Sequence, residues 1–355
     1  MGTDSTSGSK ASARRSSSTS ELFGGIYARG AVADAVGDAA WLQALLDVEA
    51  ALGGESLRAA EIDVAELGRE AAQHASPVVP LVRRFFVDTH TGATSQDVLD
   101  TAMMLVAKRA RGPLIADARA AADAAAALAQ AHRDTAIMGR TLLQDALPTS
   151  FGLKAAGWMT AIDDAAAGLA AAQLPVQMGG PVGHREPAVA AAVAQALDLE
   201  EPVLPWHTNR LAPARLAAAL GALAGVLGKL ARDVTLLPAV REGVAGRGRS
   251  TAMAHKRNPV AAVSALACTR RVPGLVATML AAMEQEHERA AGAWQAEWGT
   301  LTDLLRLTGS AVAWVRDLLE HLEVDAAAMR AGAGAAPDLG ASATLIDRAL
   351  KARRR

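Results

Sequence analysis

The sequence predicts an all-α protein built on a bundle of long helices, and three observations support this prediction. Hydrophobic residues make up 51% of the 355 residues, whereas aromatic residues make up only 3%. Alanine, the residue with the highest helix propensity, is by far the commonest of the apolar residues. The stretch "DAAWLQALLDVEAAL", residues 38–52, places apolar side chains at helical spacing. No segment shows the alternation typical of a strand, so we expect helices throughout.

Five long helices are expected, and several exceed the about 8 to 20 residues typical of globular proteins. Such lengths predict an elongated bundle that assembles into an oligomer. The expected helices span residues 97–131, 149–173, 213–241, 259–290 and 300–323. The expected domain organisation is a Ser/Thr-rich tail at 1–20 that is disordered or, alternatively, a transit peptide, a small helical domain at 21–89, a central long-helix bundle at 90–330 and a remnant C-terminal segment at 331–355.

Charge and cysteine content narrow the possible functions. The 36 lysines and arginines nearly balance the 37 aspartates and glutamates, so the overall charge does not suggest a nucleic-acid partner. The longest apolar run, Leu216 to Gly228, falls short of the about 20 residues that a membrane span needs, so no membrane partner is expected. Cys268, the single cysteine, suits a reducing cytoplasm and is expected to be a buried, inert thiol. No set of residues has metal-ligand spacing, so we expect no metal.

Two of the expected helices begin in unusually polar loops. The stretch "HTGATSQDVLD" offers Thr94 or Ser95 as the N-cap, with Asp97 placed to favour the helix start. In "KRNPVAAV", Asn258 is a good N-cap and Pro259 a good first helical residue. Free backbone N–H groups at such ends attract carboxylates. The alternative interpretation is that these residues are only caps.

The stretch "GRSTAMAHKRNP", residues 248–259, carries more polar groups than a helix cap requires. Glycines at positions 243, 246 and 248 give the chain freedom to move there. This combination predicts a mobile lid that binds an anion. The side chains expected to take part are Ser250, Thr251, His255, Lys256 and Arg257.

Three motifs together resemble the fumarase/aspartase superfamily. "GRSTAMAHKRNP" is similar to its signature loop, although Arg249, Thr251 and Ala254 depart from it, and "HTGATSQDVLDT" and "GRTLLQDALPTSFG" are similar to two further blocks. Within the superfamily, "PWHTNR" and "EHERAAGAWQAEWGTL" resemble the branch that lactonises 3-carboxy-cis,cis-muconate in protocatechuate (β-ketoadipate) breakdown. The resemblance covers residues 21–330 and implies that the superfamily's C-terminal helical domain is largely missing.

This resemblance implies an all-α subunit whose long central helices form a homotetramer, with each active site built from three subunits. It implies a small tricarboxylate substrate, no metal and no organic cofactor. The substrate-binding residues that it implies are His90, Thr94 and Ser95 from one chain, Thr141 and Gln144 from a second, and Ser250, Lys256 and Asn258 from a third.

The implied reaction places negative charge on a carboxylate beside the carbon that gains or loses a proton, so it needs preorganised donors. We interpret Ser250 as the residue that transfers the proton, beside Lys256, which holds the charge. His90 is expected to be a carboxylate ligand or a secondary acid. His255 and Arg257 are lesser candidates for substrate binding.

The remaining polar clusters are expected to be structural. His184 and His207 stand alone in proline-rich loops. His287 and Glu288 lie near Arg289 at an expected helix end, which predicts a salt-bridge cluster.

Two rival functions stay open. The first is a fumarate-releasing lyase similar to adenylosuccinate lyase. Leu142 argues against it, because the resemblance places the catalytic histidine of such lyases at this position, whereas the cycloisomerases carry an apolar or aromatic residue. The second is a catalytically degenerate helical scaffold, which the shortened C-terminal region favours.

Overall fold

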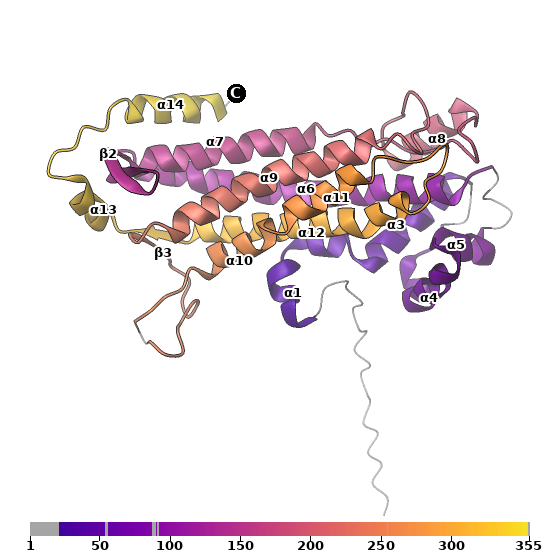
Figure 1. Ribbon diagram of the computed structural model, residues 1–355, viewed down its shortest axis with the longest axis horizontal. Helices are drawn as coiled ribbons and strands as arrows, with labels where there is room; N and C mark the ends of the chain where they lie inside the picture. The colour runs from indigo at the N-terminus through magenta and orange to yellow at the C-terminus, as the bar shows by residue number, and fades with distance from the viewer. Residues whose placement is uncertain (1–20, 54–55, 87–89, 91, 254, 354–355) are drawn as a thin grey trace, which may run out of the picture.

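The computed structural model describes residues 21–53, 56–86, 90, 92–253 and 255–353. The expected tail at residues 1–20 and the departure from the signature at residue 254 therefore lie outside the described residues. The described chain forms a bundle of long helices that run along one common direction (Figure 1). The predicted all-α fold class is confirmed.

Four helices form the centre of the bundle: α6 (Ser95–Ala131), α7 (Phe151–Ala170), α9 (Leu211–Thr235) and α12 (Ala293–Glu320). Helix α6 has 37 residues and is therefore about 55 Å long at 1.5 Å per residue. Many of its buried residues are alanines, and these small side chains let the neighbouring helices approach closely. Its length places the segments before and after it at opposite ends of the molecule.

Shorter helices surround this centre, and the last of them, α14, lies along α7 (Figure 1). Those before α6 are α1 (Glu21–Tyr27), α2 (Ala31–Ala35), α3 (Asp38–Ala51), the 3₁₀-helix η1 (Ala59–Glu61), α4 (Val64–His74) and α5 (Val78–Phe85). Those after it are α8 (Pro187–Leu197), α10 (Val260–Thr269), α11 (Val272–Ala281), α13 (Ala326–Ala333) and α14 (Ser342–Arg353).

Two small antiparallel sheets contradict the expectation that the chain has no strands. Strands β1 (Ala136–Thr141) and β2 (Gln144–Ser150) form a hairpin between α6 and α7. Strands β3 (Val240–Glu242) and β4 (Leu322–Val324) pair near the far ends of α9 and α12. The strands are short, and tertiary pairing decided their conformation over the local helical pattern.

Four of the five expected helices are present as α6, α7, α9 and α12, with shifted ends. The expectation of one helix over residues 259–290 is wrong, because the chain leaves the helix between Thr269 and Val272 and again after Ala281. Pro273 sits in the first turn of α11, where its missing N–H is not needed. Asn258 is not the N-cap of α10, since Pro259 occupies that position.

Two helical stretches, Leu211–Thr235 and Val260–Ala281, are long and apolar enough to cross a membrane by length and composition alone. Both pack within the bundle, where 44% and 39% of their most apolar windows are buried. Leu211, Val263 and Leu280 remain 41%, 53% and 49% exposed on these stretches. The bundle of one chain therefore covers only part of their apolar surface.

Cys268 on α10 is fully buried, as expected. Burial raises the pKa of its thiol to about 12, although Arg271 and Arg306 act in the opposite direction. The thiol is therefore not ionised at neutral pH and is not a nucleophile.

Candidate active site

The start of α6 is a capping box with Thr94, one of the two residues that the sequence offered, as the N-cap. The Thr94 hydroxyl accepts from the Asp97 backbone N–H at 3.4 Å, and the Asp97 carboxylate accepts from the Thr94 backbone N–H at 3.1 Å. Each residue satisfies a donor that the helix itself leaves unpaired. Ser95 follows as the first residue of the helix and is partly exposed.

Asp97 is also the centre of a buried hydrogen-bond cluster. Its carboxylate accepts from Gln177 Nε2 at 3.0 Å, from the backbone N–H groups of Gly179 and Gly180 at 2.9 Å each, and from His207 Nε2 at 2.8 Å. Burial acts to raise the pKa of Asp97, but the hydrogen bonds from His207 and Gly179 outweigh it and lower that pKa. His207 therefore does not stand alone, and the expectation that it does is wrong.

Arg289 fixes the other side of the same helix start. Its Nη2 donates to Thr94 Oγ1 and to the Gly180 carbonyl oxygen, both at 2.7 Å, and its Nη1 donates to Gln96 Oε1 at 2.9 Å. Arg289 therefore serves the α6 start and not the salt-bridge cluster that was expected with Glu288. It joins the loop before α12 to the first turn of α6.

A buried ion network lies directly below this cluster. Arg210 donates to both oxygens of Asp100, at 2.6 and 3.0 Å, and its Nε donates to Glu297 at 3.0 Å. All three side chains have no exposed surface. Burial acts to lower the pKa of the Arg210 guanidinium, but the carboxylates of Asp100 and Glu297 outweigh this effect, so the pKa is raised. The network links α6 to α12 and holds the start of α6 in place.

His90 pairs with a buried carboxylate from α3. Its Nδ1 lies 2.8 Å from Glu49 Oε1, and the Glu49 side chain is fully buried. A carboxylate at Nδ1 favours the tautomer that leaves Nε2 free to accept or to pass on a proton. Residues 87–89 and 91 lie outside the described part of the chain. The role of His90 stays a prediction.

Thr141 and Gln144 are paired at the tip of the β1–β2 hairpin, and both are exposed. Leu142 and Leu143 form the turn between them with φ of 47° and 66°. Such turns usually contain Asn or Gly, so this segment carried no hairpin signal in its sequence. The turn displays Leu142 at 97% exposure. The hairpin lies at the opposite end of the bundle from the start of α6 (Figure 1).

The third group of predicted residues lies in the loop between β3 and α10, residues 243–258. The Ser250 hydroxyl accepts from the backbone N–H groups of Ala252 and Met253, at 3.2 and 3.1 Å. His255, Lys256 and Arg257 are exposed. The loop projects away from the bundle (Figure 1).

The glycine at position 248 has a different role from the one expected. Gly248 has φ of +70°, and a Cβ there would lie 2.2 Å from the Asn258 carbonyl oxygen. The Asn258 backbone N–H donates to the Gly248 carbonyl oxygen at 2.8 Å. Gly248 therefore allows two backbones to meet closely and narrows the neck of the loop.

The start of α10 does not offer the free donors that were expected after Asn258. Glu242 Oε1 accepts from the backbone N–H groups of Ala261 and Ala262, at 2.8 and 3.2 Å. Sequence reasoning missed Glu242, His207 and the role of Arg289, because their partners are distant along the chain.

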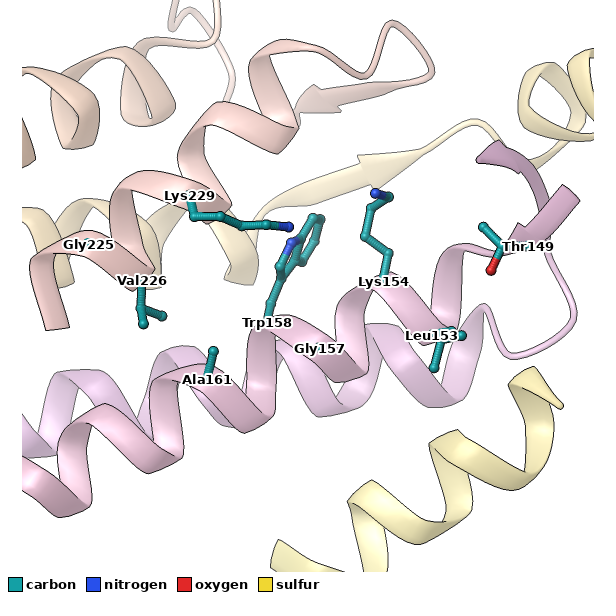
Figure 2. Close-up of a pocket in the computed structure, with 9 residues that line it drawn as sticks. All are labelled: Thr149, Leu153, Lys154, Gly157, Trp158, Ala161, Gly225, Val226 and Lys229. Carbon is teal, nitrogen blue, oxygen red and sulfur yellow. The ribbon is translucent and has the colours of Figure 1, made fainter. Parts of the chain in front are cut away.

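One chain thus holds the predicted residues at three separate places: the start of α6, the hairpin tip and the loop after β3. Among the described residues, no group of three or more His, Cys, Asp or Glu side chains is arranged to hold a metal ion. A groove of about 580 Å³ lies between α7 and α9 and contains none of the predicted residues (Figure 2). Trp158 stands there between Lys154 and Lys229.

Comparison with known proteins agrees with these motifs. Residues 82–274 match a family model described as lyase. A 3-carboxy-cis,cis-muconate cycloisomerase of Bradyrhizobium diazoefficiens is 40% identical over 358 residues, which cover 89% of this chain and 79% of the relative. A nitrosuccinate lyase of Streptomyces davaonensis is 39% identical, covering 88% and 76%. The crystal structure of a 3-carboxy-cis,cis-muconate lactonizing enzyme from Pseudomonas putida superposes with a TM-score of 0.82 at 31% identity, covering 95% and 89%.

The long-helix bundle and its three motif blocks define an enzyme of the fumarase/aspartase type. The chain belongs to this lyase family, in the group whose members include the 3-carboxy-cis,cis-muconate cycloisomerases. The membership that the sequence motifs predicted is thereby confirmed.

Proposed function

We propose that this enzyme converts 3-carboxy-cis,cis-muconate to 4-carboxymuconolactone in protocatechuate degradation. The similarity to cycloisomerases over nearly the whole chain carries this proposal. The exposed Leu142 at the hairpin tip supports it, because an apolar side chain cannot act as the acid that a fumarate-releasing lyase needs at this position.

In the proposed reaction, one substrate carboxylate oxygen forms a bond to a carbon of the conjugated diene. The neighbouring carbon receives the proton of the Ser250 hydroxyl, and the diene loses one double bond. Lys256 stabilises the resulting alkoxide and the charge on the substrate carboxylate. Return of a proton to Ser250 from solvent completes the cycle.

We propose that the active site is completed in a homotetramer in the cytoplasm, with contributions from three chains. Helix α6 separates the Thr94 region from Thr141 and Gln144 by about 55 Å in one chain, so these residues meet only if copies associate. The exposed leucines of the hairpin and the partly covered apolar faces of α9 to α11 favour such association. Light scattering tests this part, and a monomeric mass at native helical content contradicts it.

An elimination reaction is the second candidate, and the nitrosuccinate lyase at 39% identity is the observation that favours it. The proton-transfer loop and the carboxylate-binding helix start serve either reaction. The difference lies in the leaving group, which is a ring carboxylate in the reverse cycloisomerase reaction and a nitro group in the elimination.

One experiment separates the candidates. The purified protein is incubated with 3-carboxy-cis,cis-muconate while the absorbance of the conjugated diene is followed, and in parallel with nitrosuccinate and adenylosuccinate while fumarate is measured. We expect loss of the diene and no fumarate. Fumarate without loss of the diene would establish a lyase, and no turnover of any of the three substrates would contradict both candidates and favour the scaffold interpretation.

A further inference from the structure

The loop of residues 243–258 is held at its base by a side chain that touches both of its ends. Glu242 is the last residue of β3 and precedes the loop directly. Its Oε1 accepts from Ala261 and Ala262 in the first turn of α10, directly after the loop. The Glu242 side chain is only 4% exposed. One carboxylate thus joins the two segments that the loop connects.

This contact differs from an ordinary helix cap. A cap is usually the side chain of the N-cap residue itself. The N-cap of α10 is Pro259, which has no side-chain acceptor. The acceptor comes instead from 19 and 20 residues earlier in the chain. Its effect is therefore to close the loop as well as to satisfy the helix.

Further contacts act on the same base. The backbones of Gly248 and Asn258 meet at the neck of the loop, and the backbones of Arg249 and Arg257 form an antiparallel β-bridge beside them. Arg247 donates through Nη2 to Asp317 Oδ2 on α12 at 2.7 Å, and its Nη1 lies 3.7 Å from Glu242 Oε2. The base is therefore fixed to the bundle.

Beyond the neck, the loop carries several cationic side chains. Residues 248–258 include Arg249, Lys256 and Arg257 and no acidic residue. The described residues among them are mostly exposed. The position of Ser250 and Lys256 relative to the bundle therefore depends on how the base is held.

We propose that Glu242 is a positioning residue that sets where the loop carries Ser250 and Lys256, by tying β3 to the first turn of α10. This inference rests on the proposed function, in which these two residues transfer the proton and hold the substrate carboxylate. Glu242 itself does not touch the substrate.

Three variants test the proposal. Glu242→Ala removes the acceptor, whereas Glu242→Gln keeps an amide oxygen for the two N–H groups. Asp63→Ala is the matched control, because the Asp63 carboxylate caps α4 through two backbone N–H groups, at 2.9 and 3.1 Å, but from the adjacent position. Circular dichroism verifies that each variant is folded. If Glu242→Ala does not fold, Glu242→Asp is used in its place, because the shorter side chain withdraws the carboxylate by one methylene.

The first measurements need no substrate. Trypsin cleavage after the lysine and arginines of the loop is followed by mass spectrometry, and hydrogen exchange is followed at the Ala261 and Ala262 amides. We expect Glu242→Ala to accelerate both by about fivefold or more, the scale of a lost helix cap. Glu242→Gln and Asp63→Ala should leave the loop at the parent rates.

The last measurement is kinetic. With 3-carboxy-cis,cis-muconate, Glu242→Ala should lower kcat by about tenfold with little change in KM, because a misplaced proton donor affects the transition state. Glu242→Gln should recover most of this loss. Parent rates of cleavage and exchange in Glu242→Ala would overturn the proposal, and so would parent kcat in a variant with a loosened loop. If the parent itself does not act on this substrate, the proposed function fails, and cleavage and exchange alone decide whether Glu242 holds the loop.

Discussion

The start of α6 and the loop after β3 carry similar kinds of polar side chain, but these side chains differ in burial and in hydrogen bonding. At the start of α6, Asp97 accepts five hydrogen bonds and is fully buried. In the loop, Lys256 and His255 are exposed, and the Ser250 hydroxyl accepts hydrogen bonds from the next turn of its own backbone. The start of α6 is therefore ordered by contacts within a single chain, whereas the loop is tied to the bundle at its base.

This difference indicates how the proposed site works. A region whose donors are already oriented binds charge without reorganisation, which is the requirement for electrostatic catalysis. A region that is fixed at its base and free beyond it can close over a bound anion. The exposed side chains of His255 and Lys256 then face the bound anion.

Loss of the buried ion network should have the largest effect on stability. Arg210→Met leaves Asp100 and Glu297 buried without their cation, so we expect the free energy of unfolding to fall by about 3 to 5 kcal/mol. Urea unfolding measures it. Arg316→Met is the control, because its partners are on the surface and its loss should cost less than about 1 kcal/mol. Equal losses in the two variants would mean that the α6 region is not the more rigid one.

Removal of the proposed proton donor should have the largest effect on catalysis. Ser250→Ala should lower kcat by about 10²-fold with little change in KM, the scale for loss of a general acid. Lys256→Ala should raise KM as well, because the lysine also binds the ground-state carboxylate. Steady-state kinetics with 3-carboxy-cis,cis-muconate measures both, with Glu61→Ala in the exposed 3₁₀-helix η1 as control. Near-parent kcat in Ser250→Ala would move the acid to His90 or His255.

The two regions should also respond to pH in opposite directions. Hydrogen bonds lower the pKa of Asp97 despite its burial, so its contribution to stability is present above about pH 4 and is lost as pH falls through the folded pKa. Burial raises the pKa of Glu242 despite the Ala261 and Ala262 bonds, so its contribution is present at low pH and is lost as pH rises through the folded pKa.

Unfolding of the parent, Asp97→Asn and Glu242→Gln across acid pH measures these contributions. The stability gap between the parent and Asp97→Asn should narrow as pH falls below about 4. As pH falls over the same range, the stability of the parent should rise relative to that of Glu242→Gln. Parallel trends in the two variants would contradict the comparison.

The smallest expected effect concerns single hydroxyl groups. Thr94→Ala removes the cap of α6 and should cost about 1 kcal/mol of stability. Ser250→Ala should change stability by less than about 0.5 kcal/mol, because the loop beyond its neck contributes little to the fold. Chemical denaturation of both variants measures the contrast, and a larger loss in Ser250→Ala would show that the loop is part of the folded core.

Local signals were sufficient for the Thr94 cap and for four of the long helices. They were not sufficient for the contacts of His207 and Arg289, which lie 110 and 195 residues from their partners in the α6 start. Pairing over such separations leaves no periodicity in the sequence. The break between α10 and α11 did leave a signal, because Pro273 is typical of a first helical turn.

The site itself was predictable only as three motif blocks. The sequence indicates which residues are polar and which helices begin near them, and the structure agrees for Thr94. It does not indicate that Glu242 occupies the start of α10, because a carboxylate on a three-residue strand resembles any surface glutamate. Nor does it indicate how far apart in one chain the three blocks lie, because that separation follows from the length of the folded helix α6.

The β1–β2 hairpin affects how readily the newly synthesised protein aggregates. Its turn holds two leucines at positive φ, a backbone conformation that residues other than Gly and Asn rarely adopt. A third leucine, Leu147 on β2, is 78% exposed. In a single chain these leucines are exposed to water, where they favour aggregation as readily as the proposed association of copies. Under the proposed tetramer, recovery of soluble protein from cells should therefore depend on the rate at which the chains associate, and slower synthesis at lower temperature should increase it.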